Sequence, residues 1–304
     1  MIPKLPLAHW INQFVNWLYN ATGPFFEAIA NVVKAIIEGI DQFVQWLPWW
    51  LVIVLFGVLA FRSGRWKLSI GTVVGLLFIY DLQLWRHMIS TLVLVIVSSL
   101  LSLLIGLPLG IMTSKSERLH RIVTPLLDLM QTMPSFVYLV PVLMFFNIGV
   151  VPAIFATMVF AMPPSIRLTR LGILQVPKEL VEASRSFGST DWQLLRKVQL
   201  PLAMPTIKAG INQTIMLALS MVVIASMIGA GGLGADVMSA LETVDVGKGF
   251  EAGISIVIIA IVLDRISQRL GNKRLSAKPK NKQAKRYENK KENPIIDNGY
   301  SYVK

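Results

Sequence analysis

The chain has 304 residues, of which 54% are hydrophobic and only 15% are charged. This composition lies outside the range of soluble domains and indicates an integral membrane protein. The formal net charge of +12 does not by itself indicate nucleic-acid binding, because many basic residues follow the last apolar segment, where such a bias reports membrane topology.

The first 45 residues repeat large apolar side chains at helical spacing, beginning with Trp10, Phe14 and Trp17, but they contain no apolar run of spanning length. A break at Gly23-Pro24 predicts two amphipathic helices in residues 1–45. We expect these helices to lie in the outer membrane interface, and packing over the helical bundle is an equally open alternative.

Seven segments are long and apolar enough to cross the hydrocarbon core as α-helices, which satisfy their own backbone hydrogen bonds. They are residues 46–62, 67–84, 88–113, 122–146, 150–167, 207–228 and 251–269. We therefore predict an all-α membrane protein. It has two accessory helices in 46–84, a transmembrane core in 85–270 and a disordered basic tail in 271–304.

The basic residues predict the orientation of these spans. If the first span ends in the cytoplasm, only Lys4, Lys34, Arg86 and Lys248 of the 29 Lys and Arg residues fall on the other side. The positive-inside rule then places the N-terminus outside and the C-terminus inside a bacterial plasma membrane.

Residue patterns for catalysis or cofactor binding are missing. Cysteine is absent, and His9, His87 and His120 do not have metal-ligand spacing. No phosphate-binding G-x-x-x-x-G-K-[ST] loop occurs, and GAGGLG at 229–234 predicts a tight turn or a re-entrant loop, because it follows a membrane helix rather than a strand. We expect no catalytic residue, metal or cofactor in this chain.

Polar residues inside the predicted spans gather in 122–146, which contains two prolines, and at the start of 207–228. Polar groups in hydrocarbon need partners, so both segments are predicted to face the bundle interior or a cavity. The candidates for a substrate path are Gln131, Pro134, Phe136, Tyr138, Asn212 and Gln213. Hydrogen bonding between helices is the alternative for the polar residues, and packing is the alternative for the aromatic ones. For Asp128 and Asp264, near predicted helix ends, we expect pairing or solvation.

A polar and basic stretch, EASRSFGSTDWQLLRKVQLP at 182–201, interrupts the apolar pattern. It predicts a first short helix over 178–187 that ends at Gly188. A second helix from Asp191 to about Gln199 would be capped by Ser189 or Thr190 and ended by Leu200-Pro201. We predict that the two helices lie nearly at right angles on the cytoplasmic side. Residues 171–206, which contain them, are called the coupling loop below.

The spacing E-A-x-x-x-x-G-x9-[IV]-x-L-P in this stretch resembles the cytoplasmic EAA loop of ATP-binding-cassette importer permeases. The matching residues are Glu182, Ala183, Gly188, Val198, Leu200 and Pro201. Ser184 stands where an alanine is usual. Over about residues 85–270 the chain is similar to permease subunits of glycine betaine/proline betaine importers.

The resemblance implies a type I, MetI-like permease core that forms a homodimer in contact with membrane lipid. Two ATP-binding subunits would hold ATP and Mg²⁺, and a separate extracytoplasmic protein would deliver the solute; no nucleic-acid partner is implied. Glu182 would make a polar contact with the ATPase, Ala183 would allow close helix approach and Gly188 would form the turn. The alternatives are a permease for choline, carnitine or methionine, and an ion-coupled secondary transporter.

Overall fold

The computed structural model describes residues 6–62 and 66–269, and within these ranges the regular secondary structure is entirely helical. The helices are α1 (Leu7–Trp46), α2 (Trp49–Arg62), α3 (Trp66–Asp81), α4 (Trp85–Lys115), α5 (Glu117–Thr132), α6 (Leu139–Phe146), α7 (Val150–Ala161), α8 (Pro163–Leu174), α9 (Lys178–Ser186), α10 (Asp191–Leu194), α11 (Leu200–Ser226), α12 (Gly232–Thr243) and α13 (Val246–Arg269). A 3₁₀ turn, η1 (Ser135–Tyr138), precedes α6, and a π-helical turn, η2 (Leu195–Gln199), precedes α11. The predicted tail at 271–304 lies outside the described residues.

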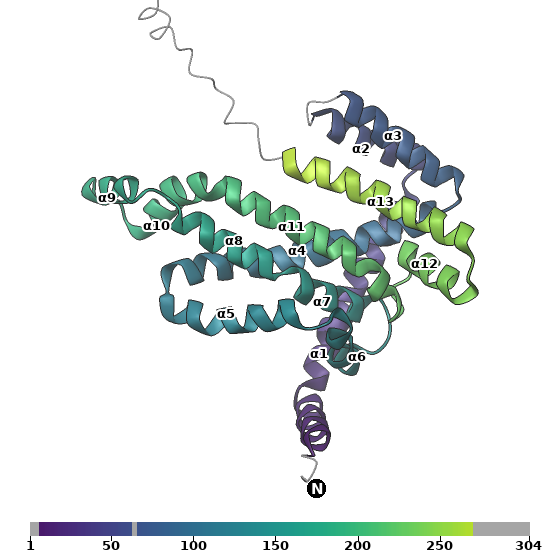
Figure 1. Ribbon diagram of the computed structural model, residues 1–304, viewed down its shortest axis with the longest axis horizontal. Helices are drawn as coiled ribbons and strands as arrows, with labels where there is room; N and C mark the ends of the chain where they lie inside the picture. Colours follow the sequence, from purple (N-terminus) through teal and green to yellow (C-terminus); the bar gives the residue numbers. More distant parts are fainter. Residues whose placement is uncertain (1–5, 63–65, 270–304) are drawn as a thin grey trace, which may run out of the picture. The chain divides into compact units, whose positions relative to one another are not determined.

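Helices α4, α7, α8 and α11 pack against one another at the centre of the bundle (Figure 1). The main hydrophobic core lies among them and includes Met88, Val95, Ile154 and Met221. Helices α12 and α13 pack on α11, and the hairpin of α2 and α3 packs on α13. This arrangement places the coupling loop at one end of the central helices.

Two small residues, Gly106 and Gly110, allow α4 to approach α8 closely. A Cβ on Gly106 would lie 1.9 Å from Ser165 Oγ, and a Cβ on Gly110 would lie 2.8 Å from the carbonyl oxygen of Ile166. Both distances are far below van der Waals contact. A side chain at either position would therefore push the two central helices apart.

Four helical runs are long and apolar enough to cross a membrane, or up to six if two bent pairs each count as one span. They overlap the predicted spans at 88–113, 150–167, 207–228 and 251–269, and two of these predicted spans end one or two residues beyond the run. The predicted count of seven exceeds six because it also includes α3, which belongs to none of these runs or bent pairs. Helix α3 has 16 residues, or about 24 Å at 1.5 Å per residue, against a hydrocarbon core of about 30 Å.

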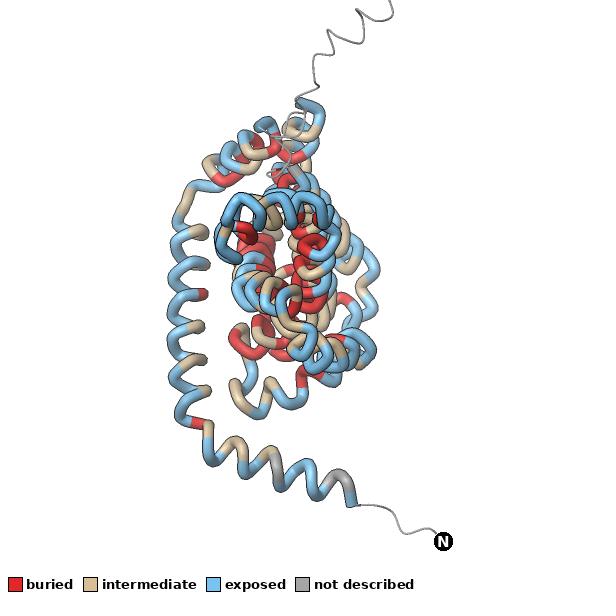
Figure 2. The backbone as a smooth tube through the Cα atoms, turned by 90° about the vertical axis from the view of Figure 1, so that its left-hand side faces the viewer, coloured by how far each residue is buried: buried red, intermediate tan, exposed pale blue. Residues whose placement is uncertain are grey.

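The prediction of two helices before residue 46 is wrong, because α1 is one helix of 40 residues with Pro24 inside it. Proline removes one backbone donor and crowds the preceding turn, which bends a helix without always ending it. Figure 2 shows α1 changing direction part of the way along its length. One face of α1 contacts α4, α6 and α7 and buries Ile37, while Trp17, Phe25 and Phe43 stay exposed.

The predicted span at 122–146 is sharply bent, and the two helices that form it pass as one span only when taken together. Helix α5 ends at Thr132, and α6 follows η1 at an angle of 114° to the preceding helix. Met133 has an extended backbone, with ψ of 137°, because the ring of Pro134 disfavours a helical conformation in the residue before it. The chain therefore turns sharply within this apolar segment.

The glycine-rich segment at 229–234 forms a turn, which is one of the two structures that the sequence predicts for it. Gly229, Gly231 and Gly232 have positive φ angles, and α12, which the sequence did not predict, begins there. The backbone N–H of Leu233 donates to Thr91 Oγ1 over 2.8 Å, so the start of α12 is held against α4.

Candidate functional site

The first helix of the coupling loop is confirmed as α9, and it ends as the sequence predicts. The N–H of Phe187 donates to the carbonyl of Ala183 over 3.1 Å, and Gly188 follows with φ of +78°. Glycine adopts this left-handed conformation without the steric cost that a side chain brings. A Cβ at Gly188 would meet no atom within 4 Å, so the need for glycine there is conformational.

Of the two predicted cap residues for the second helix, Thr190 makes the cap. Its Oγ1 accepts from the N–H of Gln193 over 3.3 Å, and Gln193 Oε1 accepts from the N–H of Thr190 over 3.0 Å. This reciprocal pair is a capping box. Ser184 Oγ donates to Ser189 Oγ over 3.0 Å. The serine that replaces the usual alanine therefore links α9 to the start of α10.

The predicted end of the second helix at Leu200-Pro201 is wrong. The chain continues from Asp191 through η2 into α11, in a helical run of 36 residues that ends at Ser226. A proline lacks one donor and crowds the turn before it, and a π-helical turn relieves both effects by bonding five residues back. The coupling loop is therefore continuous with a long central helix.

The coupling loop is anchored on one side and exposed on the other. Leu195 is 2% exposed and belongs to a small core with Ile173 and Ile207, which fixes the loop to α8 and α11. In contrast, Phe187 is 90% exposed and Trp192 is 63% exposed. Among the motif residues, Glu182, Ala183, Gly188 and Pro201 are exposed, and Val198 and Leu200 are half-buried. The loop thus presents large apolar side chains away from the bundle.

The predicted substrate-path residues in the broken span differ in their surroundings. Gln131, Pro134 and Phe136 are exposed, whereas Tyr138 is buried and donates its hydroxyl hydrogen to the carbonyl of Met130. The ring of Tyr138 also contacts that of Phe160, with centroids 6.2 Å apart. Tyr138 therefore holds the turn after α5, and the other three residues are open to contact.

Asn212 takes part in hydrogen bonds between helices, which is the alternative that the sequence left open. Its Nδ2 donates to Asp264 Oδ1 over 3.0 Å, and its Oδ1 accepts from Ser267 Oγ over 2.6 Å. These bonds join α11 to α13. The neighbouring Gln213 is exposed, and Asp264 is paired as expected.

The chain matches a protein family described as the binding-protein-dependent transport system inner membrane component. The match covers residues 102–275. The chain belongs to this family. The permease is 52% identical over 275 residues to the glycine betaine transport system permease protein OpuAB of Bacillus subtilis, with 90% of this chain and 98% of that protein covered. It is 54% identical over 276 residues to the glycine betaine/carnitine transport permease protein GbuB of Listeria monocytogenes, with the same coverage.

Among solved structures, the permease resembles a chain of the MetNI methionine ABC transporter in an inward-facing conformation. The TM-score is 0.55 at 26% identity, and the match covers 60% of this chain and 91% of that chain. The predicted MetI-like permease fold is confirmed. The permease is a multi-pass membrane subunit of an ATP-binding-cassette transporter, and the ATPase of such a transporter is a separate subunit.

Two ion pairs, whose partners the sequence did not predict, join α5 to α8 in the permease. Arg167 Nη2 lies 2.6 Å from Asp128 Oδ1, and Arg170 Nη2 lies 3.0 Å from Glu117 Oε2. The spacing of the two arginines by three residues places them on one face of α8, which is the signal that sequence reading could have used. Among the described residues, no group of three or more His, Asp or Glu is placed to hold a metal ion.

Proposed function

We propose that this permease forms the translocation path of an ATP-driven importer for glycine betaine or a related quaternary ammonium osmoprotectant. The observation that carries the proposal is the 52% and 54% identity to two permeases named for glycine betaine, one of them also for carnitine, over nearly their whole lengths. Substrate preference in a small-solute permease depends on few side chains. Choline, carnitine and methionine therefore remain the solutes against which the proposal is tested.

In the proposed assembly, two copies of the chain form a homodimer, and two ATP-binding subunits that hold ATP and Mg²⁺ dock on the coupling loops. The exposed side chains of Phe187 and Trp192 support this role, because both lie in the polar coupling loop and aromatic residues are enriched at protein interfaces. An extracytoplasmic binding protein would deliver the solute. Residues 85–270 would form the transporting core, with 46–84 as accessory helices.

The proposed coupling mechanism uses the continuity between the loop and α11. Movement of the ATPases would displace α9 and α10, and the helical run from Asp191 to Ser226 would carry that displacement across the membrane. A contact that differs between two states of the bundle biases the equilibrium between them. Glu182 would contribute a polar contact to the ATPase, Ala183 a close helix approach and Gly188 the turn.

The proposed substrate path keeps Gln131, Pro134, Phe136 and Gln213 as contact residues, because all four are exposed. The ring of Phe136 can attract a quaternary ammonium group by a cation–π interaction of roughly 0.5–2 kcal/mol. Tyr138 and Asn212 would shape this path rather than contact the solute, since both are held by hydrogen bonds within the bundle. With the coupling loop in the cytoplasm, the N-terminus lies outside.

Uptake in cells that lack other betaine systems tests the proposal. The permease is expressed with its ATPase and binding protein, and entry of radiolabelled glycine betaine is measured with and without excess choline, carnitine or methionine. We expect uptake that requires the ATPase and is not abolished by methionine. Uptake that persists after loss of the ATPase would instead indicate a secondary transporter.

Replacement of Gly188 by valine tests the coupling loop. A β-branched residue in a left-handed conformation costs roughly 1–2 kcal/mol, so we expect Gly188→Val to lower betaine uptake about tenfold or more while the protein still reaches the membrane. Gly188→Asn should retain more uptake, because asparagine tolerates this conformation better.

Gly71→Val is the matched control for Gly188→Val. Gly71 lies in α3, where an added side chain meets no atom within 4 Å and the backbone is helical. Uptake and membrane abundance of the control should match those of the wild type. Normal uptake by Gly188→Val would remove Gly188 from the coupling mechanism.

A further inference from the structure

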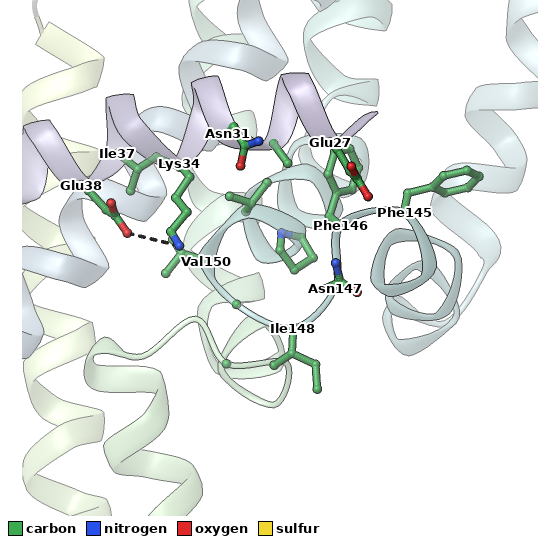
Figure 3. A pocket seen from close by; sticks show the side chains of 15 residues that line it. Glu27, Asn31, Lys34, Ile37, Glu38, Phe145, Phe146, Asn147, Ile148 and Val150 are labelled. Carbon is green, nitrogen blue, oxygen red and sulfur yellow. Dashed lines mark ion pairs between the residues drawn. The ribbon is translucent and has the colours of Figure 1, made fainter. Parts of the chain in front are cut away.

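A cavity of about 590 Å³ lies between α1 and the turn that joins α6 to α7 (Figure 3). Its volume falls within the range of about 300–1,000 Å³ that is usual for small-molecule sites. Helix α1 lines it with Glu27, Asn31, Lys34 and Glu38, whose spacing of three or four residues places them on one face. The opposite wall is formed by the turn at residues 147–149 and by its neighbours.

The cavity lies at the opposite end of α11 from the coupling loop. Helix α11 follows that loop, runs for 27 residues, or about 40 Å, and ends at Ser226 just before Gly229, which lines the cavity. With the coupling loop in the cytoplasm, the cavity is at the outer side of the membrane. It is therefore reached from outside and is separate from the ATPase-docking surface.

The walls of the cavity are held in place by contacts outside it. The ring of Phe146 stacks on Phe155 with centroids 4.3 Å apart and meets the ring of Phe26 edge to face at 5.6 Å. The N–H of Gly149 donates to the carbonyl of Ile228 over 2.9 Å, which ties the turn to the end of α11. The buried side chain of Ile37 anchors α1 in the main core. The site is therefore preformed, which reduces the cost of binding a ligand.

The polar side chains of α1 do not bond across the cavity. In the part of the chain that the structure describes, Glu27 and Asn31 make no side-chain hydrogen bond or ion pair. Lys34 Nζ lies 3.8 Å from Glu38 Oε1, and both side chains are more than half exposed, so this pair is weak and can exchange partners. Figure 3 shows Glu27, Asn31 and Lys34 directed toward the turn that carries Asn147. The two carboxylates and one ammonium suit a ligand that carries both charges.

We propose that this cavity binds a zwitterion, with its cationic ammonium group at Glu27 and its anionic group at Lys34. Asn31 lies between Glu27 and Lys34 and can donate a hydrogen bond to the anionic group. Two sources have this chemistry: a soluble betaine-type solute, which rests on the proposed function, and the headgroup of a phospholipid such as phosphatidylethanolamine. Phe25, Val32 and Ile36 are exposed on α1 beside the polar face, so the same helix can contact the membrane.

The test uses the transporter assembled with its ATPase, without the binding protein, in lipid nanodiscs. In one arm the discs contain only phosphatidylglycerol, and equilibrium binding of radiolabelled glycine betaine is measured. In the other arm the discs also contain phosphatidylethanolamine, and the lipid retained by the protein is counted by native mass spectrometry. The variants are Glu27→Gln and Lys34→Gln, and the control is Glu242→Gln, an exposed carboxylate on α12 outside the cavity.

We expect one of the two ligands to bind the wild type and the control, and each cavity variant to weaken that binding about tenfold or more, because each removes the charge that attracts the opposite charge of the ligand. Betaine binding that depends on both residues identifies the soluble source, and lipid retention that depends on both identifies the headgroup. If neither ligand shows this dependence, the proposal is overturned. Cellular uptake of glycine betaine is measured separately. The binding results for the cavity variants can therefore be interpreted even if the proposed transport function is wrong.

Discussion

Phe187 is the most exposed large hydrophobic residue of the coupling loop, at 90%, and it directly precedes the left-handed Gly188. The backbone conformation of Gly188 therefore sets the direction of the chain from the end of α9, where Phe187 lies, to α10. Aromatic residues in such positions commonly supply much of the binding energy of a protein interface. Leu195, in the same loop, is buried and serves the fold instead.

Replacement of Phe187 by alanine should weaken docking of the ATPase. Loss of an aromatic anchor typically costs about 2 kcal/mol or more, which corresponds to roughly thirtyfold weaker association. The measurement is the affinity of the purified permease for its ATPase subunit in detergent. Phe250→Ala, at a residue 70% exposed on α13 and outside the coupling loop, is the control and should bind normally. Equal affinities for the two variants would remove Phe187 from the interface.

At the level of elements, the position of α5 depends on its two ion pairs with α8. Glu117 and Asp128 lie near the two ends of α5, and Arg170 and Arg167 hold them. The opposite face of α5 exposes Ile122, Leu126 and Leu129, and the inner face buries Leu127 against Met162 and Ile166, so the ion pairs act together with this small apolar cluster. Because the sharp turn at Pro134 follows α5, the ion pairs also influence where the predicted path residues lie.

Charge reversal at Arg167 should disturb this arrangement. Arg167→Glu places a like charge beside Asp128, and since both side chains are about half exposed we expect an effect of only about 1 kcal/mol, seen as a several-fold loss of uptake. The double variant with Asp128→Arg restores opposite charges and should recover part of the uptake. If the double variant is no better than the single one, the ion pair does not position α5.

Three prolines show which features of the elements local sequence could predict. Pro134 ends a helix as its sequence suggests, because Met133 before it takes an extended conformation. Pro24 only bends α1, and Pro201 is accommodated after a π-helical turn. A proline favours a break in the backbone, but the tertiary packing of the flanking segments decides whether the helix continues.

For the whole molecule, the absence of cysteine makes the predicted orientation directly testable. Glu179 lies on α9 and Glu242 on α12, which follow opposite ends of the central helices. Both side chains are exposed. Single cysteines at these positions report the two sides of the membrane without background labelling.

We expect Glu242→Cys to react with a membrane-impermeant maleimide in intact cells, and Glu179→Cys to react only after the membrane is opened. The physical reason is the excess of basic residues on the side of the coupling loop, which the positive-inside rule assigns to the cytoplasm. The cysteine-free wild type is the control and should remain unlabelled. Labelling of Glu179→Cys in intact cells would reverse the proposed topology.

The sequence by itself determined the membrane class, the permease family resemblance, the helix α9, the turn at Gly188 and most of the long apolar helices. These features follow from hydrophobic length, capping and backbone preferences, which act between residues near one another in the chain. Only the tertiary structure decided that Asn212 bonds to Asp264, that Arg167 and Arg170 hold α5, and that α1 closes a cavity against the turn after α6. Those contacts join residues 39 or more positions apart, and local pattern cannot specify which partners the packing brings together.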